Sequence, residues 1–369
     1  MHGYRFAGHA QAMTELLQLL TPEGERRHDP EYDVEVSGEE LRGLFRDMVL
    51  VRRLDTEAHA LQRQGELGLW PPLLGQEAAQ IGAGRALQPS DYAFPTYREH
   101  GVAWTRGVDP VRLLALFRGV TNGGYDAAAH NFALATIVIG DQTLHAVGYA
   151  MGVQRDAGLD SPPGSAVLSF FGDGASSQGD VNEAFVWAAV NNAPVVFFCQ
   201  NNQWAISQPL HRQTRIPLYQ RAEGFGFPGI RVDGNDVLAV LAATRAALHR
   251  AREAGGPSLI EAYTYRMGAH TTSDDPTRYR VDTELEQWRL KDPIERVRAY
   301  LMRTGAGDGA FIAGVEAEAD ALGIRLRDAC RRLPDPPPSA MFDHVYAQPH
   351  PLVAQEHQWW QEYLGDDHG

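Results

Sequence analysis

The sequence contains only two cysteines, Cys199 and Cys330, among 369 residues. A disulfide framework is therefore excluded as the basis of the fold, and Cys199, inside an apolar segment, is expected to be a small buried residue. No apolar run approaches the roughly 18 residues of a transmembrane helix. The first 20 residues also contain no uninterrupted apolar block typical of a secretory signal. We therefore expect a cytoplasmic protein with no membrane partner.

Basic residues are also in deficit, with 33 Lys and Arg against 47 Asp and Glu and a formal net charge of −14. Nucleic acids and anionic membranes bind to basic surfaces, so we expect no nucleic acid as a partner. No internal repeat is present. The hydrophobic content of 44% and charged content of 22% are typical of a globular protein whose length allows one or two domains.

The middle of the chain predicts a βαβ unit. Residues 166–171 and 194–199 are apolar segments with the length and flanking residues of buried strands. A crossover of this length makes the two strands parallel, so their carboxyl ends meet at the sheet edge where open α/β folds bind ligands. Residues 182–190 between them have helical spacing. The side chains expected on the buried face of this helix are Ala184, Val186, Trp187 and Val190.

Polar residues follow both predicted strands. Gly172, Asp173 and Gly174 come after the first strand, and Asn202 comes after the second. The oxygens of Asp173 and Asn202 suit a hard cation such as Mg²⁺, which binds one or two protein ligands together with phosphate oxygens. The glycines allow backbone N–H groups to approach such phosphates closely. A glycine turn that binds nothing stays an alternative for Gly172 to Gly174 alone, and the matching position of Asn202 argues against it.

Two other kinds of phosphate-binding loop have glycine patterns similar to this stretch. A dinucleotide fingerprint needs a third glycine where Ser177 stands, which makes that interpretation weak. The nucleoside-triphosphate loop needs a lysine followed by serine or threonine after its second glycine. Asp180 and Val181 occupy these positions, so a negative charge stands where a positive one is required.

These motifs resemble a known family. The stretch from Gly172 to Asn202 resembles the thiamin diphosphate motif, and residues 200–207 resemble its form in the α subunits of 2-oxo acid dehydrogenase E1 components. The resemblance extends from about Gly75 to Tyr346 and includes, in the family's order, residues 75–78, 97–101 and 268–275. It implies an α/β thiamin diphosphate-binding fold with a parallel sheet flanked by helices. The implied cofactors are thiamin diphosphate and Mg²⁺.

The resemblance also implies a role for individual residues. Tyr97 and Arg98 match positions that bind the cofactor diphosphate, which suits the planar donors of a guanidinium group. Ile139 matches the apolar residue that supports the bent cofactor. His270 matches a catalytic histidine beside the diphosphate and the reacting carbon, where it stabilises negative charge or moves a proton. The implied cofactor-binding residues are Tyr97, Arg98, Ile139, Gly172, Asp173, Gly174, Ala175, Asn202 and His270, and the implied metal ligands are Asp173, Asn202 and the backbone carbonyl of Trp204.

The sequence departs from the family pattern at three positions. Gln200 stands where some relatives have a basic residue, so one phosphate contact is expected to be weaker or absent. Trp204 replaces a tyrosine, which is harmless if only its carbonyl binds metal. Thr271 stands where mitochondrial relatives carry a phosphorylated serine, which puts that regulation in doubt. Residues 75–78 are interpreted as structural.

The implied reaction is oxidative decarboxylation of a small 2-oxo acid and transfer of the acyl group to the lipoyl group of an E2 acyltransferase. No carboxylate that could activate the cofactor's pyrimidine ring can be assigned in this chain, since Glu183 lies near the metal motif instead. In two-chain relatives it comes from the E1 β subunit of an α2β2 heterotetramer. We therefore expect this chain to supply only the diphosphate and metal half of the site, and to be active only with a β subunit.

Branched-chain 2-oxo acids are the preferred substrates, because residues 97–99 and 270–275 look closer to that subgroup. Pyruvate and acetoin dehydrogenase α subunits stay open as alternatives. A non-catalytic scaffold subunit is an alternative of a different class.

Three regions are expected along the chain. Residues 1–36 are predicted to be an N-terminal arm that lies on the surface or on a partner, and residues 37–333 the cofactor-binding domain with C-terminal helices. Residues 334–369 form a tail whose aromatic residues are expected to contact another subunit. Within the domain, Ser37 with Glu40 has the spacing of a capping box, and Asn235 or Asp236 is expected to cap the helix 237–252.

Overall fold

The computed structural model describes residues 16–121, 123–158 and 161–366. In this part of the chain, five parallel strands form one sheet in the order β1-β2-β3-β7-β6. The strands are β1 (Tyr92–Phe94), β2 (Val167–Gly172), β3 (Val195–Asn201), β7 (Ser258–Tyr263) and β6 (Gly229–Asp233), and β4 (Trp204–Ala205) pairs with β5 (Gln208–Pro209) in a separate hairpin. The predicted βαβ unit is confirmed, because β2 and β3 pair in parallel with Gly172 opposite Gln200.

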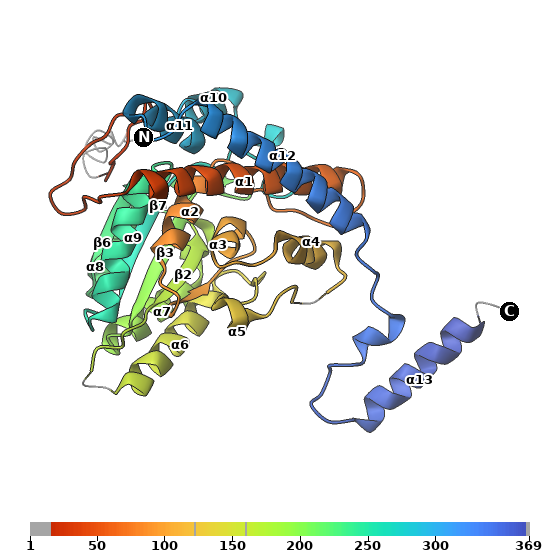
Figure 1. The fold of residues 1–369 in the computed structure, drawn as a ribbon. Coiled ribbons are helices and arrows are strands. Elements are labelled where there is room, and N and C mark those ends of the chain that lie inside the picture. Colours follow the sequence, from red (N-terminus) through yellow and green to blue (C-terminus); the bar gives the residue numbers. More distant parts are fainter. Residues whose placement is uncertain (1–15, 122, 159–160, 367–369) are drawn as a thin grey trace, which may run out of the picture.

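The helices lie on both faces of the sheet (Figure 1). They are α1 (Gly38–Arg63), α2 (Glu77–Ala86), α3 (His100–Thr105), α4 (Pro110–Arg118), α5 (Ala127–His130), α6 (Asp141–Ala157), α7 (Gly179–Val190), α8 (Arg221–Phe225), α9 (Val237–Arg252), α10 (Asp282–Arg289), α11 (Pro293–Thr304), α12 (Gly309–Arg331) and α13 (Pro351–Asp366). Asp236 caps α9 as predicted, because it accepts from Leu238 and Ala239. Ser37 accepts from the Glu40 N–H at the start of α1, but the Glu40 carboxylate binds Arg245, so only the Ser37 half of the predicted capping box is present.

Successive side chains along a strand point to opposite faces of the sheet, so the interior is divided into two cores. Leu168 and Phe170 of β2 pack with buried residues of α1, α2 and α9, whereas Val167 and Phe171 pack with those of α6 and α7. A strand that is buried on both faces is typical of parallel sheets. The confirmed fold class is therefore an α/β fold in which a parallel sheet is flanked by helices, with α1 and α12 forming an outer layer over one face (Figure 1).

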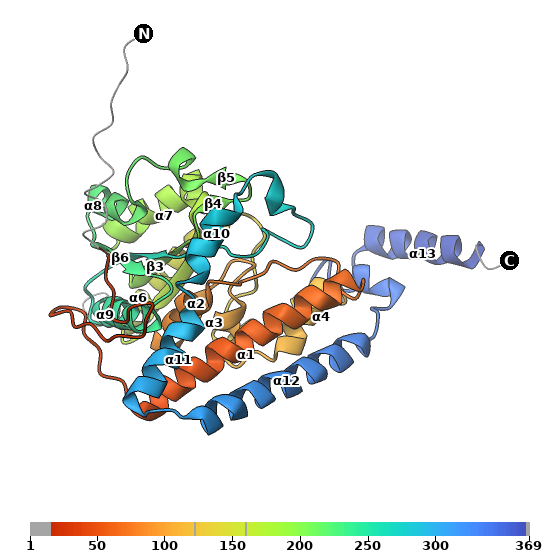
Figure 2. The ribbon, with the colours of Figure 1, turned by 90° about the horizontal axis from the view of Figure 1, so that it is seen from above.

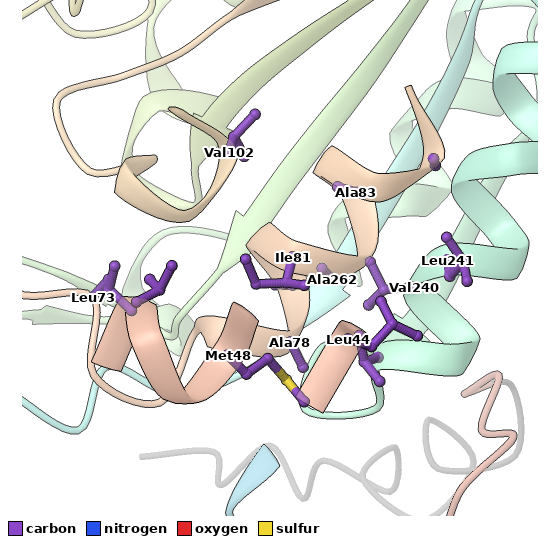
Figure 3. Close-up of a cluster of buried hydrophobic side chains, with 14 of the residues drawn as sticks. Leu44, Met48, Leu73, Ala78, Ile81, Ala83, Val102, Val240, Leu241 and Ala262 are labelled. Atoms are coloured by element: carbon purple, nitrogen blue, oxygen red, sulfur yellow. The ribbon is translucent and has the colours of Figure 1, made fainter. Parts of the chain in front are cut away.

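Small residues on α2 allow it to pack closely between α1 and α9. A Cβ atom added at Gly82 would lie 2.8 Å from Val240 Cγ1 of α9, so only glycine fits this contact. Figure 3 shows Ala78 and Ile81 of α2 between Met48 of α1 and the α9 side chains. This packing fixes the position of the turn before α2, which reaches the carboxyl edge of the sheet.

Within the predicted surface arm, residues 17–21 are mostly buried, whereas most of residues 22–36 are exposed or partly exposed. Leu17, Leu19 and Leu20 are buried, and Asp236 Oδ2 accepts hydrogen bonds from the N–H groups of Leu19 and Leu20 at 2.6 Å. Asp236 therefore caps α9 and holds this segment at the same time. The arm's first 15 residues lie outside the described residues.

The buried face of α7 also differs from the prediction. Ala184 is buried as expected, but Val186, Trp187 and Val190 are exposed. The other buried residues of the helix are Val181, Phe185 and Ala188. The helix is apolar almost all round, so its spacing alone does not select the inward face.

The tail stands apart from the body of the molecule. Figures 1 and 2 show α13 beyond the end of α12, joined to it by an extended segment, and Trp359 and Tyr363 are exposed. Phe342 in the connecting segment stacks on His357 of α13 at a centroid distance of 4.8 Å. None of the helices in the described ranges is long and apolar enough to cross a membrane.

Candidate active site

Four neighbouring strands deliver the predicted site residues to one edge of the sheet. β1 leads to Arg98, β2 to Asp173, β3 to Asn202 and β7 to His270. Because these strands are parallel, their carboxyl ends open at the same side. A cavity of about 250 Å³ lies there. Its lining residues are Thr96, Tyr97, Arg98, Glu99, Thr136, Val138, Ile139, Gly140, Gln142, Gly172, Asp173, Gly174, Ala175, Gln200, Asn202, Trp204, Ala205, Ile206 and His270.

Every site residue predicted from the sequence is among these lining residues. The structure therefore brings together residues that are separated by up to 173 positions in the chain, from Tyr97 to His270. Their individual roles in binding or catalysis stay predictions, and the geometry of each is described below.

Asp173 is one of two buried carboxylates that line the cavity, the other being Glu99. Its side chain accepts a hydrogen bond from Gln213 Nε2 at 2.7 Å. Burial raises the pKa of Asp173 to about 6, while the hydrogen bond from Gln213 acts in the opposite direction. A carboxylate held in this way is costly to ionise without a cation beside it. The site thus favours a positively charged ligand at Asp173.

Asn202 and Trp204 supply the neutral oxygens. Asn202 Nδ2 donates to Gln76 Oε1 at 3.0 Å, and its Oδ1 accepts from the Trp204 N–H at 3.3 Å. The Trp204 carbonyl accepts from Arg266 Nη1 at 3.0 Å. A carbonyl oxygen has a second lone pair, so this bond leaves one position for a metal ion.

The donor set fits a hard divalent cation. It consists of one carboxylate, one amide oxygen and one carbonyl oxygen, a combination that suits an ion completing its shell with phosphate oxygens and water. Among the described residues, no group of three or more His, Cys, Asp or Glu side chains could hold a metal ion.

His270 lies between two arginines. Its Nδ1 is 3.3 Å from Arg98 Nη2 and 3.4 Å from Arg266 Nη1. Guanidinium nitrogens only donate, so Nδ1 is the acceptor and the imidazole proton is on Nε2. Burial, followed by the charges of Arg98 and Arg266, lowers the pKa of His270 to about 3. While the cavity holds no anion, the His270 imidazole is neutral at physiological pH and donates from Nε2.

Arg98 is held in place by main-chain oxygens. Its Nη1 donates to the Pro72 carbonyl at 2.6 Å, and its Nη2 donates to the His270 carbonyl at 2.8 Å. Its guanidinium carbon lies 5.5 Å from the centroid of the Tyr97 ring. A guanidinium group fixed between two loops is preorganised to meet an anion in the cavity.

Part of the cavity wall, at Val138 and Ile139, is apolar. Ile139 lines it and is 41% exposed. Gly140, the last residue of the turn before α6, has a φ of +88°. A Cβ atom added at Gly140 would lie 3.0 Å from Val181 Cγ2. The turn is therefore packed against the start of α7, next to the loop that carries Asp173.

The two glycines beside Asp173 have different environments. A Cβ at Gly174 would lie 2.7 Å from the Cβ of Ala205, so this glycine allows the loop after β2 to approach β4. A Cβ at Gly172 would meet nothing within 4 Å, because the position faces open space. Gly174 is therefore required by packing, while Gly172 leaves room for a ligand.

Comparisons with known proteins agree with this geometry. The profile of the family described as "Dehydrogenase E1 component" matches residues 45–322. The chain belongs to the dehydrogenase E1 component family. The "3-methyl-2-oxobutanoate dehydrogenase subunit alpha" of Mycobacterium tuberculosis strain ATCC 25618 / H37Rv is 48% identical to it over 346 residues, which are 93% of both chains.

Two pyruvate-type relatives also match. The "Pyruvate dehydrogenase E1 component subunit alpha" of Acholeplasma laidlawii is 36% identical over 88% of this chain and 94% of its own. The protein of the same name from Staphylococcus aureus strain Mu50 is 38% identical over 80% of this chain and 79% of its own. These relatives are named as α subunits, which implies a β subunit for each of them.

Membership of the family identifies this E1 chain as an oxidoreductase component and implies thiamin diphosphate as its cofactor. The chemistry of the lining residues suits that molecule. The buried oxygens of Asp173 and Asn202 and the side chain of Arg98 suit a metal-bound diphosphate, and the apolar wall at Ile139 suits an aromatic ring.

Sequence analysis of the E1 chain missed two residues that hold the site. Arg266 is fully buried just after β7. Its position just after an apolar strand is the sequence feature that could have revealed it. Gln213, which binds Asp173, lies in an irregular segment 40 residues further along the chain and carries no pattern that marks it.

Proposed function

We propose that this chain is the α subunit of a 2-oxo acid dehydrogenase E1 component that decarboxylates branched-chain 2-oxo acids with thiamin diphosphate and Mg²⁺, and that the product acyl group passes to the lipoyl group of an E2 acyltransferase. The observation that carries the proposal is the convergence of Asp173, Asn202 and His270 in one cavity of an E1-family chain. Identity of 48% to a 3-methyl-2-oxobutanoate dehydrogenase subunit, against 36% and 38% to pyruvate-type subunits, favours a branched-chain substrate.

Each residue of the site has a proposed role that follows from its chemistry. Asp173, Asn202 and the Trp204 carbonyl hold Mg²⁺, and Arg98 and Tyr97 bind the diphosphate. His270 donates from Nε2 towards negative charge in the cavity, because its Nδ1 faces two guanidinium groups. The bound cofactor supplies the electron sink for loss of CO₂.

A second chain is needed to complete this site. Glu99 is the other carboxylate of the lining, but both the Thr96 N–H and the Thr96 hydroxyl donate to it at 2.5 Å, so it is committed to a turn. Exposed apolar residues surround the cavity at Val138 and Ile206. These features support a β subunit that covers the opening and supplies the missing carboxylate in an α2β2 assembly.

The decisive test is co-expression with the neighbouring β-type chain and assay with an artificial electron acceptor. We expect turnover of three branched-chain 2-oxo acids to exceed that of pyruvate, and expect the α chain alone to show almost none. Preferred turnover of pyruvate or acetoin would move the chain to those subgroups. Full activity without a β chain would refute the shared site. The cytoplasmic location stays a prediction that cell fractionation checks.

Substitution of Asp173 separates a catalytic subunit from a scaffold. Asp173→Ala removes the only carboxylate among the proposed metal ligands, so cofactor binding and turnover should both be lost. Asp180→Ala is the matched control, because Asp180 is exposed and does not line the cavity. A scaffold would assemble and function unchanged with either substitution.

A further inference from the structure

Three buried carboxamides meet at the proposed metal ligand Asn202. Gln76, at the turn before α2, is 0% exposed, Gln200 at the end of β3 is 3% exposed, and Asn202 is 7% exposed. Gln76 Oε1 accepts hydrogen bonds from Gln200 Nε2 and from Asn202 Nδ2, both at 3.0 Å. Gln76 therefore contacts a proposed metal ligand, although it does not line the cavity itself.

The direction of these bonds follows from one main-chain group. Gln76 Nε2 donates to the carbonyl oxygen of Leu73 at 3.4 Å. A carbonyl can only accept, so the Gln76 amide has its nitrogen towards Leu73 and its oxygen towards the other two side chains. Gln200 and Asn202 must then both present their NH₂ groups to Gln76. A carboxamide orientation is assigned through such a network, and here the network begins at a fixed acceptor.

The same network directs two oxygens away from Gln76. Asn202 Oδ1 accepts from the Trp204 N–H, on the side of the cavity. Gln200 Oε1 is buried and has no hydrogen-bond partner in the ranges that the structure describes, although Gln200 lines the cavity. A buried acceptor without a partner is rare in folded proteins. Gln200 Oε1 is therefore free to accept from a donor in whatever occupies the cavity.

The chemistry of this acceptor limits what can satisfy it. Diphosphate oxygens only accept hydrogen bonds at neutral pH, so they cannot bind Gln200 Oε1. A water molecule on Mg²⁺ donates strongly, and Mg²⁺ usually keeps several such waters. Gln200 lies opposite Gly172 on the neighbouring strand, and Gly172 has no side chain to separate it from the cavity.

We propose that Gln76 is a positioning residue that orients both Asn202 and Gln200, and that Gln200 Oε1 accepts a hydrogen bond from a metal-bound water. This inference rests on the proposed function, because it assumes Mg²⁺ and thiamin diphosphate in the cavity. It changes the interpretation of two residues. Gln76 orients a metal ligand in addition to its structural role in residues 75–78. Gln200 contacts the hydrated metal, and it does more than replace a basic residue that would bind phosphate.

The test uses the assembled α and β chains and measures the Kd of Mg²⁺ by calorimetry at saturating thiamin diphosphate. Gln76→Met keeps the size of the side chain and removes its hydrogen bonds, so the Kd should rise by about 10- to 100-fold, as for other supporting residues of metal sites. Gln76→Glu keeps an acceptor for both amides but loses the donor to the Leu73 carbonyl, so the Kd should rise by less than in Gln76→Met.

Gln200→Met tests the water contact directly. We expect the Mg²⁺ Kd to rise about tenfold, with a smaller change for Ca²⁺, because Ca²⁺ depends less on retained water. The double variant with Gln76→Met should be at most about twofold weaker than Gln76→Met alone, since the two residues act through one network. Thr244→Val is the control for burial, because Thr244 Oγ1 is buried in α9, does not line the cavity, and has no hydrogen-bond partner among the described residues.

Each result decides between the inference and its rivals. An unchanged Mg²⁺ Kd in Gln200→Met overturns the water contact, and an equal loss in Gln76→Met and Gln76→Glu overturns the positioning role. If Gln76→Met fails to assemble, Gln76→Glu and Gln200→Met still decide the two parts. If the original protein takes up no thiamin diphosphate with Mg²⁺, the proposed function has failed instead.

Discussion

Arg266 donates a hydrogen bond from Nη1 to the backbone oxygen of Trp204 at 3.0 Å, so the carbonyl proposed to bind Mg²⁺ is also held by a buried guanidinium group. Its Nη2 donates to the Ile206 carbonyl at 2.7 Å and to the Tyr279 hydroxyl at 2.9 Å. Arg266 therefore fixes the turn after β3 to the segment after β7. The bond orients the carbonyl, while the positive charge opposes the metal.

The first prediction concerns this shared carbonyl. Arg266→Lys keeps the charge but loses the planar group that reaches two carbonyls at once, so the Trp204 oxygen is no longer fixed. We expect the Kd of thiamin diphosphate in the presence of Mg²⁺ to rise about tenfold, measured by calorimetry on the assembled protein. Arg325→Lys, at an exposed ion pair, is the control. Equal affinities in both variants would show that the charge alone matters.

The second prediction concerns Asp173 in the absence of cofactor. Burial raises the pKa of Asp173 to about 6 from 3.8, so the folded chain binds more protons than the unfolded chain between these values. Burial of Asp173 therefore lowers the free energy of unfolding above pH 6. This destabilisation disappears as the pH falls below 4. Asp173→Asn should therefore stabilise the chain at pH 7 by on the order of 3 kcal/mol, while it abolishes metal binding.

Urea unfolding at pH 4 and pH 7 checks this prediction. The gain in Asp173→Asn should be present at pH 7 and absent at pH 4, whereas Asp180→Asn, at an exposed position, should show no gain at either pH. A variant that is less stable than the original chain at pH 7 would contradict the assigned cost of burying this carboxylate.

The sequence was sufficient for those parts of the fold that depend on local pattern. The parallel pairing of β2 and β3, the caps at Ser37 and Asp236 and the approach of Asp173 to Asn202 follow from spacing and from the identity of residues at element ends. Tyr97, Arg98, Ile139 and His270 were expected in the cavity from the family resemblance. The features that it missed depend on which surfaces meet. Val186 and Trp187 of α7 are exposed because tertiary packing, which the pattern does not encode, selected another face.

The contacts of the site itself show the same limit. Gln213 reaches Asp173 from a segment without regular structure, and Gln76 reaches Asn202 from a position 126 residues away. A glutamine has no special spacing or neighbour that reveals such a role. Arg266 was better marked, since an arginine that follows a buried strand either emerges into solvent or holds main-chain oxygens.

The third prediction concerns the acid stability of the chain. The pKa of His270 is lowered to about 3 from 6.5, so the unfolded chain binds a proton in this interval that the folded chain excludes. The contribution of this group to stability is therefore fully present above pH 6.5 and is lost as the pH falls towards 3. His270→Gln should make the decline of stability over this interval less steep. His145→Gln, on the exposed part of α6, should leave the decline unchanged, and equal slopes in all three proteins would contradict the assignment.

The fourth prediction compares the two glycines beside Asp173. Gly174→Ala places a methyl group 2.7 Å from the Ala205 Cβ, so it should lower the free energy of unfolding by about 1–3 kcal/mol. Gly172→Ala meets no atom within 4 Å and should fold normally, but it should weaken cofactor binding because it fills cavity space. Thermal unfolding and calorimetry separate the two effects. Gly179→Ala, with no atom within 4 Å and outside the cavity, should change neither.

The last prediction concerns the tail. Trp359 and Tyr363 of α13 are 58% and 62% exposed, and large aromatic side chains at such positions are typical of surfaces that another chain covers. Because α13 stands apart from the body in Figures 1 and 2, truncation after Leu333 should leave the unfolding temperature of the α chain unchanged. The same truncation should weaken assembly with the β chain, measured by analytical ultracentrifugation. Trp359→Ser should weaken it in part, whereas Glu356→Gln, an exposed polar change on the same helix, should not. Undiminished assembly of the truncated chain would show that the tail serves no subunit contact, and a loss of α-chain stability would show that it supports its own domain.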